Sequence, residues 1–283
     1  MLSLGIDIGG TSTKLAMLHD GRVAWTGQSV FYSKPDQAGL IKAFQEAADG
    51  RVSKANHCGI CVPGLLNDDR SIVTMSVNVP GLMNVPLIEL VRSAFGDATP
   101  NVKVHNDAIS CATDVVVSLR LKGRSLVLAM GTGVGSAVLD DLVPLLVDGG
   151  SSGHFGMMDV SVDGAVPIGP DGGAGSLEGY IGVPALRRDY GNDINAALAQ
   201  LTPGDACLKA LARAIRIGHA IYRPHNVVLA GGIGIRLREN LQVIRQLVDK
   251  QLTAAARSDW KLLCAITDFH AACGVARLAS AVD

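Results

Sequence analysis

The chain has 283 residues, with 25 basic and 26 acidic side chains and a formal net charge of −1. Its length predicts about two domains, and its balanced charge argues against a large basic surface for nucleic acid or anionic lipid. With 48% hydrophobic residues and 33 glycines, the composition also excludes a disordered chain and a coiled coil.

The first third of the chain predicts alternating strands and helices. Residues 2–8 form an apolar run that ends in Gly9-Gly10, residues 13–18 follow, and the Asp20-Gly21 pair predicts a hairpin into a strand at 22–31. Asp36 is expected to cap a helix that runs to about residue 48. A buried strand is expected at 57–62, a helix from Pro86 to about residue 95, a strand at 102–105 and a helix at 108–121.

The opening pattern then returns. Residues 127–130 predict a strand that enters the turn Gly131-Thr132-Gly133, and further strands are expected at 135–139 and 142–147. Superposing Gly10-Thr11 on Gly131-Thr132 aligns Ala16 with Ala137, Leu18 with Leu139 and Asp20 with Asp141, and places Leu128 opposite Asp7. We interpret this as a two-copy repeat of α/β units, with a chance match over so few positions as the alternative.

The rest of the chain predicts a glycine-rich functional loop at 148–176, helices from residue 186, at 206–222, 235–256 and 271–281, and a strand at 227–230. No stretch reaches the roughly 20 apolar residues of a spanning helix, and no basic region precedes an apolar run at the start. We therefore expect no membrane partner. Six cysteines do not suggest a disulfide framework, so a cytoplasmic location is expected.

Three glycine turns follow predicted strands. They are Gly9-Gly10-Thr11, Gly131-Thr132-Gly133 and Gly231-Gly232. Glycine lets backbone N–H groups approach an anion, and a threonine hydroxyl adds a donor. One such turn has an ordinary steric explanation, but two that share a repeat frame, together with a third, favour phosphate binding. None of them is a P-loop, and the second leads into a strand, which disfavours a dinucleotide site.

Two aspartates lie at strand ends. Asp7 interrupts an apolar strand, where it either holds hydrated Mg²⁺ beside phosphates or bonds the N–H groups of the turn. Asp107 lies between a strand and a helix, where it either caps the helix or acts as a general base on a substrate hydroxyl.

Other candidates have simpler explanations. Cys58 and Cys61 lie within one predicted strand and point to opposite faces, so buried structural thiols are favoured over a metal site. His154 is either a ligand-binding or an ordinary loop histidine. Glu178 is at an expected helix start, where an acidic residue is favourable in any case. Lys14 either meets phosphate or is a solvated strand lysine.

Together these motifs resemble the ROK family of sugar kinases, over nearly the whole chain. The matching stretches are 5–11 and 130–135 for phosphate, 59–64 and Asn78 on the sugar side, Asn106-Asp107-Ala108 around the base, 176–178, and 229–232 on the adenosine side. The resemblance implies an α/β, two-lobed actin-like (ribonuclease H-like) fold with duplicated β-sheet domains and an interdomain cleft. The domains implied are 1–110 with 271–283, and 111–270.

The resemblance also implies a reaction and the roles of individual residues. ATP with Mg²⁺ would phosphorylate a sugar hydroxyl, usually the sixth of a hexose, with Asp107 as general base and Asp7 holding Mg²⁺ through water. Sugar contacts would come from Gly64, Asn78, Asn106, Asp107, His154 and Glu178. Phosphate contacts would come from Asp7, Gly9, Gly10, Thr11, Lys14, Gly131, Thr132, Gly133, Gly231 and Gly232. A homodimer is implied as well.

Because the sequence departs from the family pattern at two sugar-side positions, it does not determine which sugar is the substrate. His154 stands where glucokinases of the family carry glutamate, and Met157 replaces a histidine that contacts sugar and ligates a structural zinc. The cysteines that supply the other zinc ligands are absent from 166–176, so we expect no zinc. An N-acetylmannosamine or N-acetylglucosamine kinase, a degenerate sugar-binding protein, and polyphosphate as donor are the alternatives. Family repressors carry a DNA-binding segment before the first phosphate motif, which here starts at residue 5, so we expect a kinase and no nucleic-acid partner.

Overall fold

The structure is a computed structural model, which describes residues 1–76, 78–147, 150–164, 166–170 and 172–281. The chain forms two compact units. Unit 1 contains residues 1–114, 150–151 and 269–281, and unit 2 contains residues 115–147 and 152–268. Among the residues described, no helix combines the length and the apolar composition needed to cross a bilayer.

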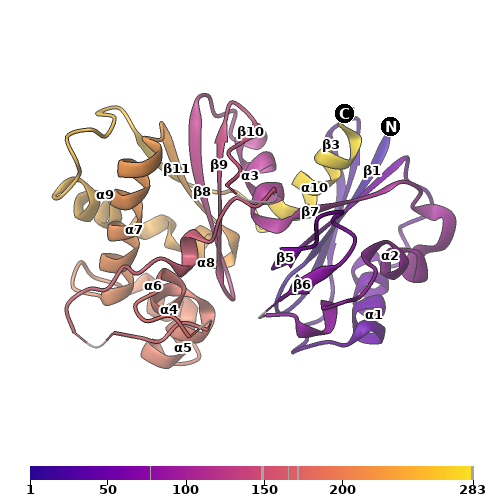
Figure 1. The fold of residues 1–283 in the computed structure, drawn as a ribbon, viewed down its shortest axis with the longest axis horizontal. Coiled ribbons are helices and arrows are strands. Elements are labelled where there is room, and N and C mark those ends of the chain that lie inside the picture. Colours follow the sequence, from indigo (N-terminus) through magenta and orange to yellow (C-terminus); the bar gives the residue numbers. More distant parts are fainter. Residues whose placement is uncertain (77, 148–149, 165, 171, 282–283) are drawn as a thin grey trace. The chain divides into compact units, whose positions relative to one another are not determined.

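Unit 1 is built on a five-stranded mixed sheet (Figure 1). Its strands are β1 (Leu2–Ile8), β2 (Thr13–His19), β3 (Arg22–Gln28), β4 (His57–Val62) and β7 (Val102–Asn106), in the order β3-β2-β1-β4-β7. The first three form an antiparallel meander, and β4 and β7 run parallel to β1. Asp20 and Gly21 both have positive φ, as a tight hairpin of matching twist requires.

One face of this sheet is covered by α1 (Gln37–Ala48) and α2 (Leu87–Phe95). Asp36 caps α1 as expected, since its side chain accepts a hydrogen bond from Gly39 N–H. Pro86 directly precedes α2. Between β4 and α2 the chain forms the short elements β5 (Leu65–Leu66), β6 (Val73–Met75) and the 3₁₀ turn η1 (Pro80–Leu82), and the 3₁₀ turn η2 (Gly96–Ala98) follows α2.

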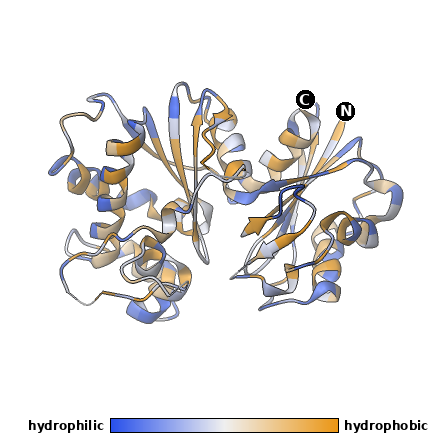
Figure 2. Ribbon diagram, viewed as in Figure 1, coloured by the Kyte–Doolittle hydropathy of each residue, from blue (hydrophilic) through white to orange (hydrophobic). Residues whose placement is uncertain are grey.

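The other face is covered by the last helix, α10 (His270–Ser280), which packs on β1, β2 and β4. Gly5 and Gly59 are paired across β1 and β4, and each meets the α10 backbone. A Cβ on Gly5 would lie 1.9 Å from the Ala272 carbonyl oxygen, so glycine is needed for this close approach. Hydropathy colouring shows the apolar strands of this sheet between its helices (Figure 2).

Unit 2 repeats the same sheet. Its strands are β8 (Arg124–Met130), β9 (Val134–Asp140), β10 (Val143–Pro144), β11 (Asn226–Ala230) and β12 (Lys261–Cys264), in the order β10-β9-β8-β11-β12. The pattern of antiparallel and parallel pairs matches that of unit 1. The burial patterns of β1 and β8 are also the same along all seven positions. The predicted duplication is therefore confirmed.

The alignment of the two copies needs one correction. Residues 9–12 join β1 to β2, whereas the shorter stretch 131–133 joins β8 to β9. An alignment through the turn therefore shifts the first strands by one position. Asp7 pairs with Lys14, and the corresponding pair in the second copy is Ala129 with Gly135. The counterpart of Asp7 is thus Ala129 and not Leu128, and it carries no charge.

Several expected boundaries were wrong. The strand expected at 142–147 is short: β10 covers only Val143–Pro144, and Leu145 N–H still donates to the Val138 carbonyl of β9 at 2.8 Å. The edge turn at Asp141 and Leu142 takes positive φ, and Pro144 has no N–H for the ladder. The helix expected at 235–256 is three pieces: α8 (Gly231–Arg236), the 3₁₀ turn η4 (Leu237–Asn240) and α9 (Leu241–Asp249). Strand β12 was not expected.

The remaining helices belong mainly to unit 2. They are α4 (Leu177–Ile181), α5 (Val183–Tyr190), α6 (Ile194–Ala199) and α7 (Ala206–Tyr222), with the 3₁₀ turn η3 (Phe155–Met157). Helix α7 packs on α4, α9 and β8 and supplies much of the apolar core. Helix α3 (Asp107–Ser118) begins in unit 1, and its residues from Val115 group with unit 2.

Candidate active site

Asp7 lies near the carboxyl end of β1, on the sheet face that α10 covers. Its neighbours on the adjacent strands are Lys14 on β2 and Cys61 on β4. The Cys61 thiol contacts Asp7 Oδ1 at 3.6 Å and the Ala271 carbonyl oxygen at 3.7 Å. The Lys14 ammonium lies 5.8 Å from the centre of the Phe269 ring. The half-buried Asp7 thus has a cationic and a weakly polar neighbour.

The first glycine turn is held by Tyr32, a residue the sequence analysis missed. The Tyr32 hydroxyl donates to the Gly9 carbonyl at 2.7 Å and lies 3.2 Å from Thr13 Oγ1, and its backbone N–H donates to the Thr11 carbonyl at 2.9 Å. Gly9 N–H donates to the Ser12 carbonyl at 3.0 Å rather than to Asp7. No sequence pattern identifies Tyr32, because its bonds depend on how the chain returns after β3.

Helix α3 begins at Asp107, but Asn106 caps it. Asn106 Oδ1 accepts from Ile109 N–H at 3.1 Å, the usual geometry of an N-cap. Asp107 Oδ1 accepts from the adjacent Ala108 N–H, at 2.8 Å. Within the described part of the chain, the cap occupies the side-chain oxygen of Asn106 and leaves its amide nitrogen without a hydrogen-bond partner. Of the two alternatives for Asp107, the helix cap is therefore not the one that the structure shows, because Asn106 fills that position.

The protonation of Asp107 is strongly perturbed. Burial raises the pKa of Asp107 to about 7, the negative charge of Asp7 adds to this rise, and the hydrogen bond from Ala108 N–H acts against it. A carboxylate that titrates near neutral pH can take up and release a proton under ordinary conditions. The hydrogen bond from Ala108 N–H and the pKa near 7 are both compatible with proton transfer by Asp107.

Gly64 and Asn78 lie in the segment that follows β4. Gly64 has φ +110°, and a Cβ there would lie 2.1 Å from the Met75 carbonyl oxygen, so the glycine is required sterically. Asn78 is half-buried in the bend between β6 and η1. The last residue of β4, Val62, pairs with Asn106 on β7. The segment after β4 therefore begins beside Asn106.

The second glycine turn contacts Glu178. Gly131 N–H bonds the Gly133 carbonyl at 2.9 Å, and Val134 N–H donates to Glu178 Oε2 at 2.7 Å. Glu178 is 4% exposed, and its carboxylate lies where a Cβ on Gly133 would be. The explanation of Glu178 as a merely favourable first-turn residue is therefore insufficient.

His154 is exposed and directly precedes η3. Met157 is half-buried, and its N–H donates to the His154 carbonyl at 2.9 Å. Gly156 packs on Val134, where a Cβ would lie 2.1 Å from the carbonyl oxygen. The segment around His154 thus contacts the strand that leaves the second glycine turn.

The third glycine turn lies beside the second. Gly231 has φ +73°, and a Cβ there would lie 2.4 Å from the carbonyl oxygen of Met130, the residue before Gly131. Strand β11 ends at Ala230, and α8 starts at Gly231. The Gly232 carbonyl accepts a hydrogen bond from the Arg236 guanidinium. The two glycine turns of unit 2 are therefore neighbours at the ends of adjacent strands.

Cys58 and Cys61 of β4 are both buried, as expected. Both are free thiols, and burial raises the pKa of Cys58 to about 12. Across the described ranges, no three histidine, cysteine, aspartate or glutamate side chains gather as they would around a metal ion.

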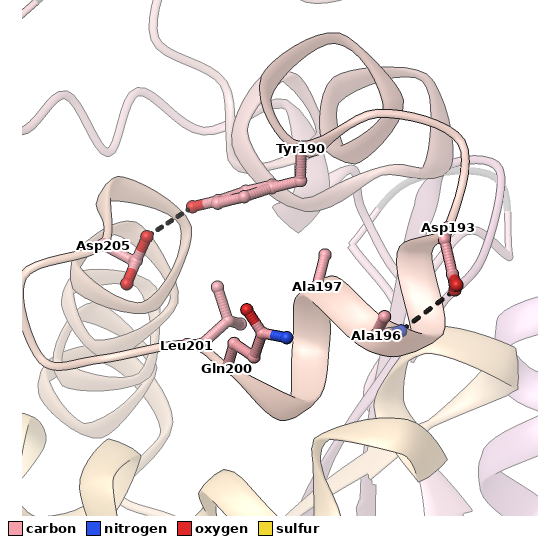
Figure 3. Close-up of a pocket in the computed structure, with 7 residues that line it drawn as sticks. All are labelled: Tyr190, Asp193, Ala196, Ala197, Gln200, Leu201 and Asp205. Carbon is pink, nitrogen blue, oxygen red and sulfur yellow. Dashed lines mark hydrogen bonds between the residues drawn. The ribbon is translucent and has the colours of Figure 1, made fainter.

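A cavity of about 390 Å³ lies elsewhere in unit 2, between α5, α6 and α7 (Figure 3). Its lining residues are Tyr190, Asp193, Ala196, Ala197, Gln200, Leu201 and Asp205, none of which the sequence analysis selected. Both carboxylates are engaged: Asp193 caps α6, and Asp205 accepts from Tyr190 and Thr202. Two carboxylates make this cavity unsuitable for phosphate.

The profile of the ROK family matches residues 3–282. The chain belongs to the ROK family.

Several characterised proteins and solved structures are similar to this chain, all at 28% sequence identity or less. It is 28% identical to an N-acetyl-D-glucosamine kinase from Erwinia tasmaniensis, over 81% of this chain and 83% of that protein. It is 25% identical to an N-acetylmannosamine kinase from Vibrio cholerae serotype O1, over 67% and 64%. A ROK family glucokinase from Streptomyces griseus, solved with glucose and AMPPNP, has the same fold, with a TM-score of 0.78 at 22% identity over 99% of both chains. The two-lobed actin-like fold is thereby confirmed.

Proposed function

We propose that this protein is an ATP-dependent sugar kinase in which Asp107 is the general base. The observation that carries the proposal is the arrangement at the start of α3. Asn106 caps the helix, one Asp107 oxygen is fixed by Ala108 N–H, and the pKa of Asp107 is about 7. Asp107 would take the proton of the attacking hydroxyl as that oxygen bonds to the γ-phosphorus and the bond to the β-phosphate oxygen breaks.

The glycine turns supply the phosphate contacts in this proposal. Gly9 and Gly131 bond carbonyls within their own turns and so hold the shape of those turns. Gly10 and Thr11 of unit 1, and Thr132, Gly133, Gly231 and Gly232 of unit 2, would offer backbone N–H groups and threonine hydroxyls to anionic oxygens. Lys14 adds positive charge beside the first turn. ATP is favoured over polyphosphate because the chain, with a net charge of −1, has no basic run to hold a long polyanion.

Asp7 fits the role of a magnesium-holding carboxylate. It is half-buried at a strand end beside the first glycine turn, and Mg²⁺ commonly uses one or two carboxylates together with phosphate oxygens and water. Bound Mg²⁺ would supply charge neutralisation for the transferred phosphoryl group. Its counterpart Ala129 has no carboxylate, so the repeat provides this ligand in unit 1 only.

The sugar would be a hexose phosphorylated at its sixth hydroxyl. Gly64, Asn78, Asn106, His154 and Glu178 would contact it, as family resemblance implies. The amide nitrogen of Asn106 supports this because capping uses only its oxygen. The relatives that act on N-acetylglucosamine and N-acetylmannosamine make N-acetylhexosamines the alternative substrates. The exposed His154 and the half-buried Met157 favour a selectivity unlike that of a typical glucokinase.

We also propose a homodimer in a reducing, cytoplasmic setting. All six cysteines are free thiols and buried, which accords with such a setting.

ADP release tests the proposed activity. The panel would contain Mg-ATP with glucose, mannose, fructose, N-acetylglucosamine and N-acetylmannosamine, and parallel reactions would contain polyphosphate. We expect turnover with one of these sugars and a loss of about 10²–10⁴-fold in Asp107→Asn. A fully active Asp107→Asn would refute the assigned base. Sugar binding by calorimetry without turnover of any sugar would indicate the degenerate binding protein.

A further inference from the structure

The backbone N–H that ends the second glycine turn is held by a buried acidic side chain. Val134 is the first residue of β9, and its N–H donates to Glu178 Oε2 at 2.7 Å. Glu178 is 4% exposed, and a Cβ on Gly133 would lie 2.5 Å from the same carboxylate oxygen. The carboxylate is therefore seated directly against the turn, in space that only glycine leaves open.

In the first copy of the repeat, the equivalent backbone N–H donates to a neutral hydroxyl group. Thr13 is the first residue of β2 and the counterpart of Val134, and its N–H donates to Ser29 Oγ at 3.0 Å. A neutral hydroxyl is thus sufficient to satisfy this N–H. The N–H that begins the second strand of each copy therefore does not by itself require a carboxylate, and the acidic side chain of Glu178 is a difference between the two copies.

Two further contacts join the turn to the corner that carries Glu178. Val183 N–H donates to the Gly131 carbonyl at 2.9 Å. A Cβ on Gly182 would lie 2.8 Å from the Thr132 carbonyl oxygen. Glu178, Gly182 and Val183 all lie on α4, on α5 or at their junction. A displacement of this corner must therefore alter the shape of the turn.

We propose that Glu178 is a positioning residue of the second glycine turn and couples sugar binding to ATP binding. The inference rests on the proposed function, in which Glu178 also contacts the sugar. A carboxylate beside a phosphate-binding turn repels phosphate oxygens. A sugar hydroxyl that donates a hydrogen bond to Glu178 disperses part of that charge and fixes the side chain. Sugar then strengthens ATP binding, and by linkage ATP strengthens sugar binding by the same factor.

Calorimetry tests this coupling. The dissociation constant of the non-hydrolysable analogue AMPPNP with Mg²⁺ is measured with and without a saturating concentration of the sugar that the wild-type enzyme phosphorylates. We expect sugar to tighten analogue binding at least about fivefold in the wild-type protein. Glu178→Gln keeps an acceptor for Val134 N–H but removes the charge, and Glu178→Asp keeps the charge but shortens the reach. In both variants we expect the ratio of the analogue's dissociation constants without and with sugar to fall below about twofold.

Ser29→Ala is the matched control, because it removes the neutral acceptor at the equivalent position. It should weaken analogue binding equally with and without sugar and leave the ratio unchanged. A wild-type ratio in the Gln variant would overturn the proposal, as would a ratio of one in a wild-type enzyme that phosphorylates the sugar. Absence of turnover in the wild-type enzyme would instead reject the proposed function. Thermal melting verifies that each variant is folded.

Discussion

The negative charge of Asp7 raises the pKa of Asp107, together with the larger effect of burial. The two carboxylates belong to different elements: Asp7 to the first strand, and Asp107 to the first turn of α3. Their coupling predicts how activity depends on pH. Because the base must be ionised to accept a proton, kcat/KM should rise with pH and level off above an apparent pKa near 7.

The pH–rate profile measures this directly. Asp7→Asn removes the neighbouring charge, so the residual activity of that variant should have a lower apparent pKa than the wild type. Burial persists in the variant, and the pKa should remain above the ordinary aspartate value of about 3.9. An unchanged profile in Asp7→Asn would show that the coupling is absent in solution.

Removal of the Tyr32 hydroxyl should loosen the first glycine turn. Tyr32→Phe loses the hydrogen bond to the Gly9 carbonyl and the contact with Thr13 Oγ1. With about 1 kcal/mol per net hydrogen bond, we expect KM for ATP to rise about fivefold, with a small change in KM for sugar. Tyr222→Phe is the control, since it removes a hydroxyl from unit 2, where Tyr222 packs near Phe155. Equal effects of both substitutions would contradict the assignment.

A buried ionic cluster should stabilise unit 1. Asp114 is 2% exposed, its Oδ2 lies 2.6 Å from His270 Nδ1, and its Oδ1 accepts from Arg277 Nε at 2.6 Å. Burial acts to raise the pKa of Asp114, but the hydrogen bonds and charges of His270 and Arg277 hold it below the ordinary value. Asp114→Ala leaves Arg277 without this carboxylate, and we expect it to lower the free energy of unfolding by about 3–5 kcal/mol.

Urea denaturation measures the loss of unfolding free energy in Asp114→Ala, and Glu89→Gln, which breaks an exposed ion pair, is the comparison. Glu89 pairs with Arg92 at 2.8 Å, but both side chains are about 60% exposed. Its loss should change the unfolding free energy by less than about 1 kcal/mol. Similar losses for the two variants would show that burial of the Asp114 cluster adds nothing.

His219 predicts loss of stability at acidic pH. It is 1% exposed and its ring packs edge-on against Trp260. Burial, and then the positive charge of Arg245, lower the pKa of His219 to about 4, while Asp249 acts in the opposite direction. In the unfolded chain His219 takes up a proton near pH 6.5, whereas in the folded protein it does so only near pH 4. The stability contributed by the neutral, buried His219 is therefore complete above pH 6.5 and is lost as pH falls towards 4. The total effect is on the order of 3 kcal/mol.

His219→Phe keeps an aromatic ring against Trp260 and removes the titrating group. Denaturation midpoints at pH 7.5 and pH 5 should differ less in this variant than in the wild type. The raised pKa of Asp107 favours the folded state as pH falls, but this effect is the same in both proteins and cancels in the comparison. A variant as acid-sensitive as the wild type would assign the loss to another group.

The sequence by itself determined most strands of the two large sheets, the glycine turns and the duplication. These depend on local patterns: an apolar run that ends in glycine, the Asp20-Gly21 pair, and the cap at Asp36. The family motifs also selected Asp107 and Glu178 from their local context, without showing what each side chain contacts.

Only the tertiary structure decided which side chains meet. Asn106 rather than Asp107 caps α3, the shorter second turn aligns Ala129 with Asp7, and Glu178 reaches back to Val134. The contacts that hold Tyr32 on the first turn, and His270 and Arg277 on Asp114, join residues far apart in the chain. Burial, register and charge coupling arise from how distant segments pack, whereas sequence patterns report mainly the preferences of neighbouring residues.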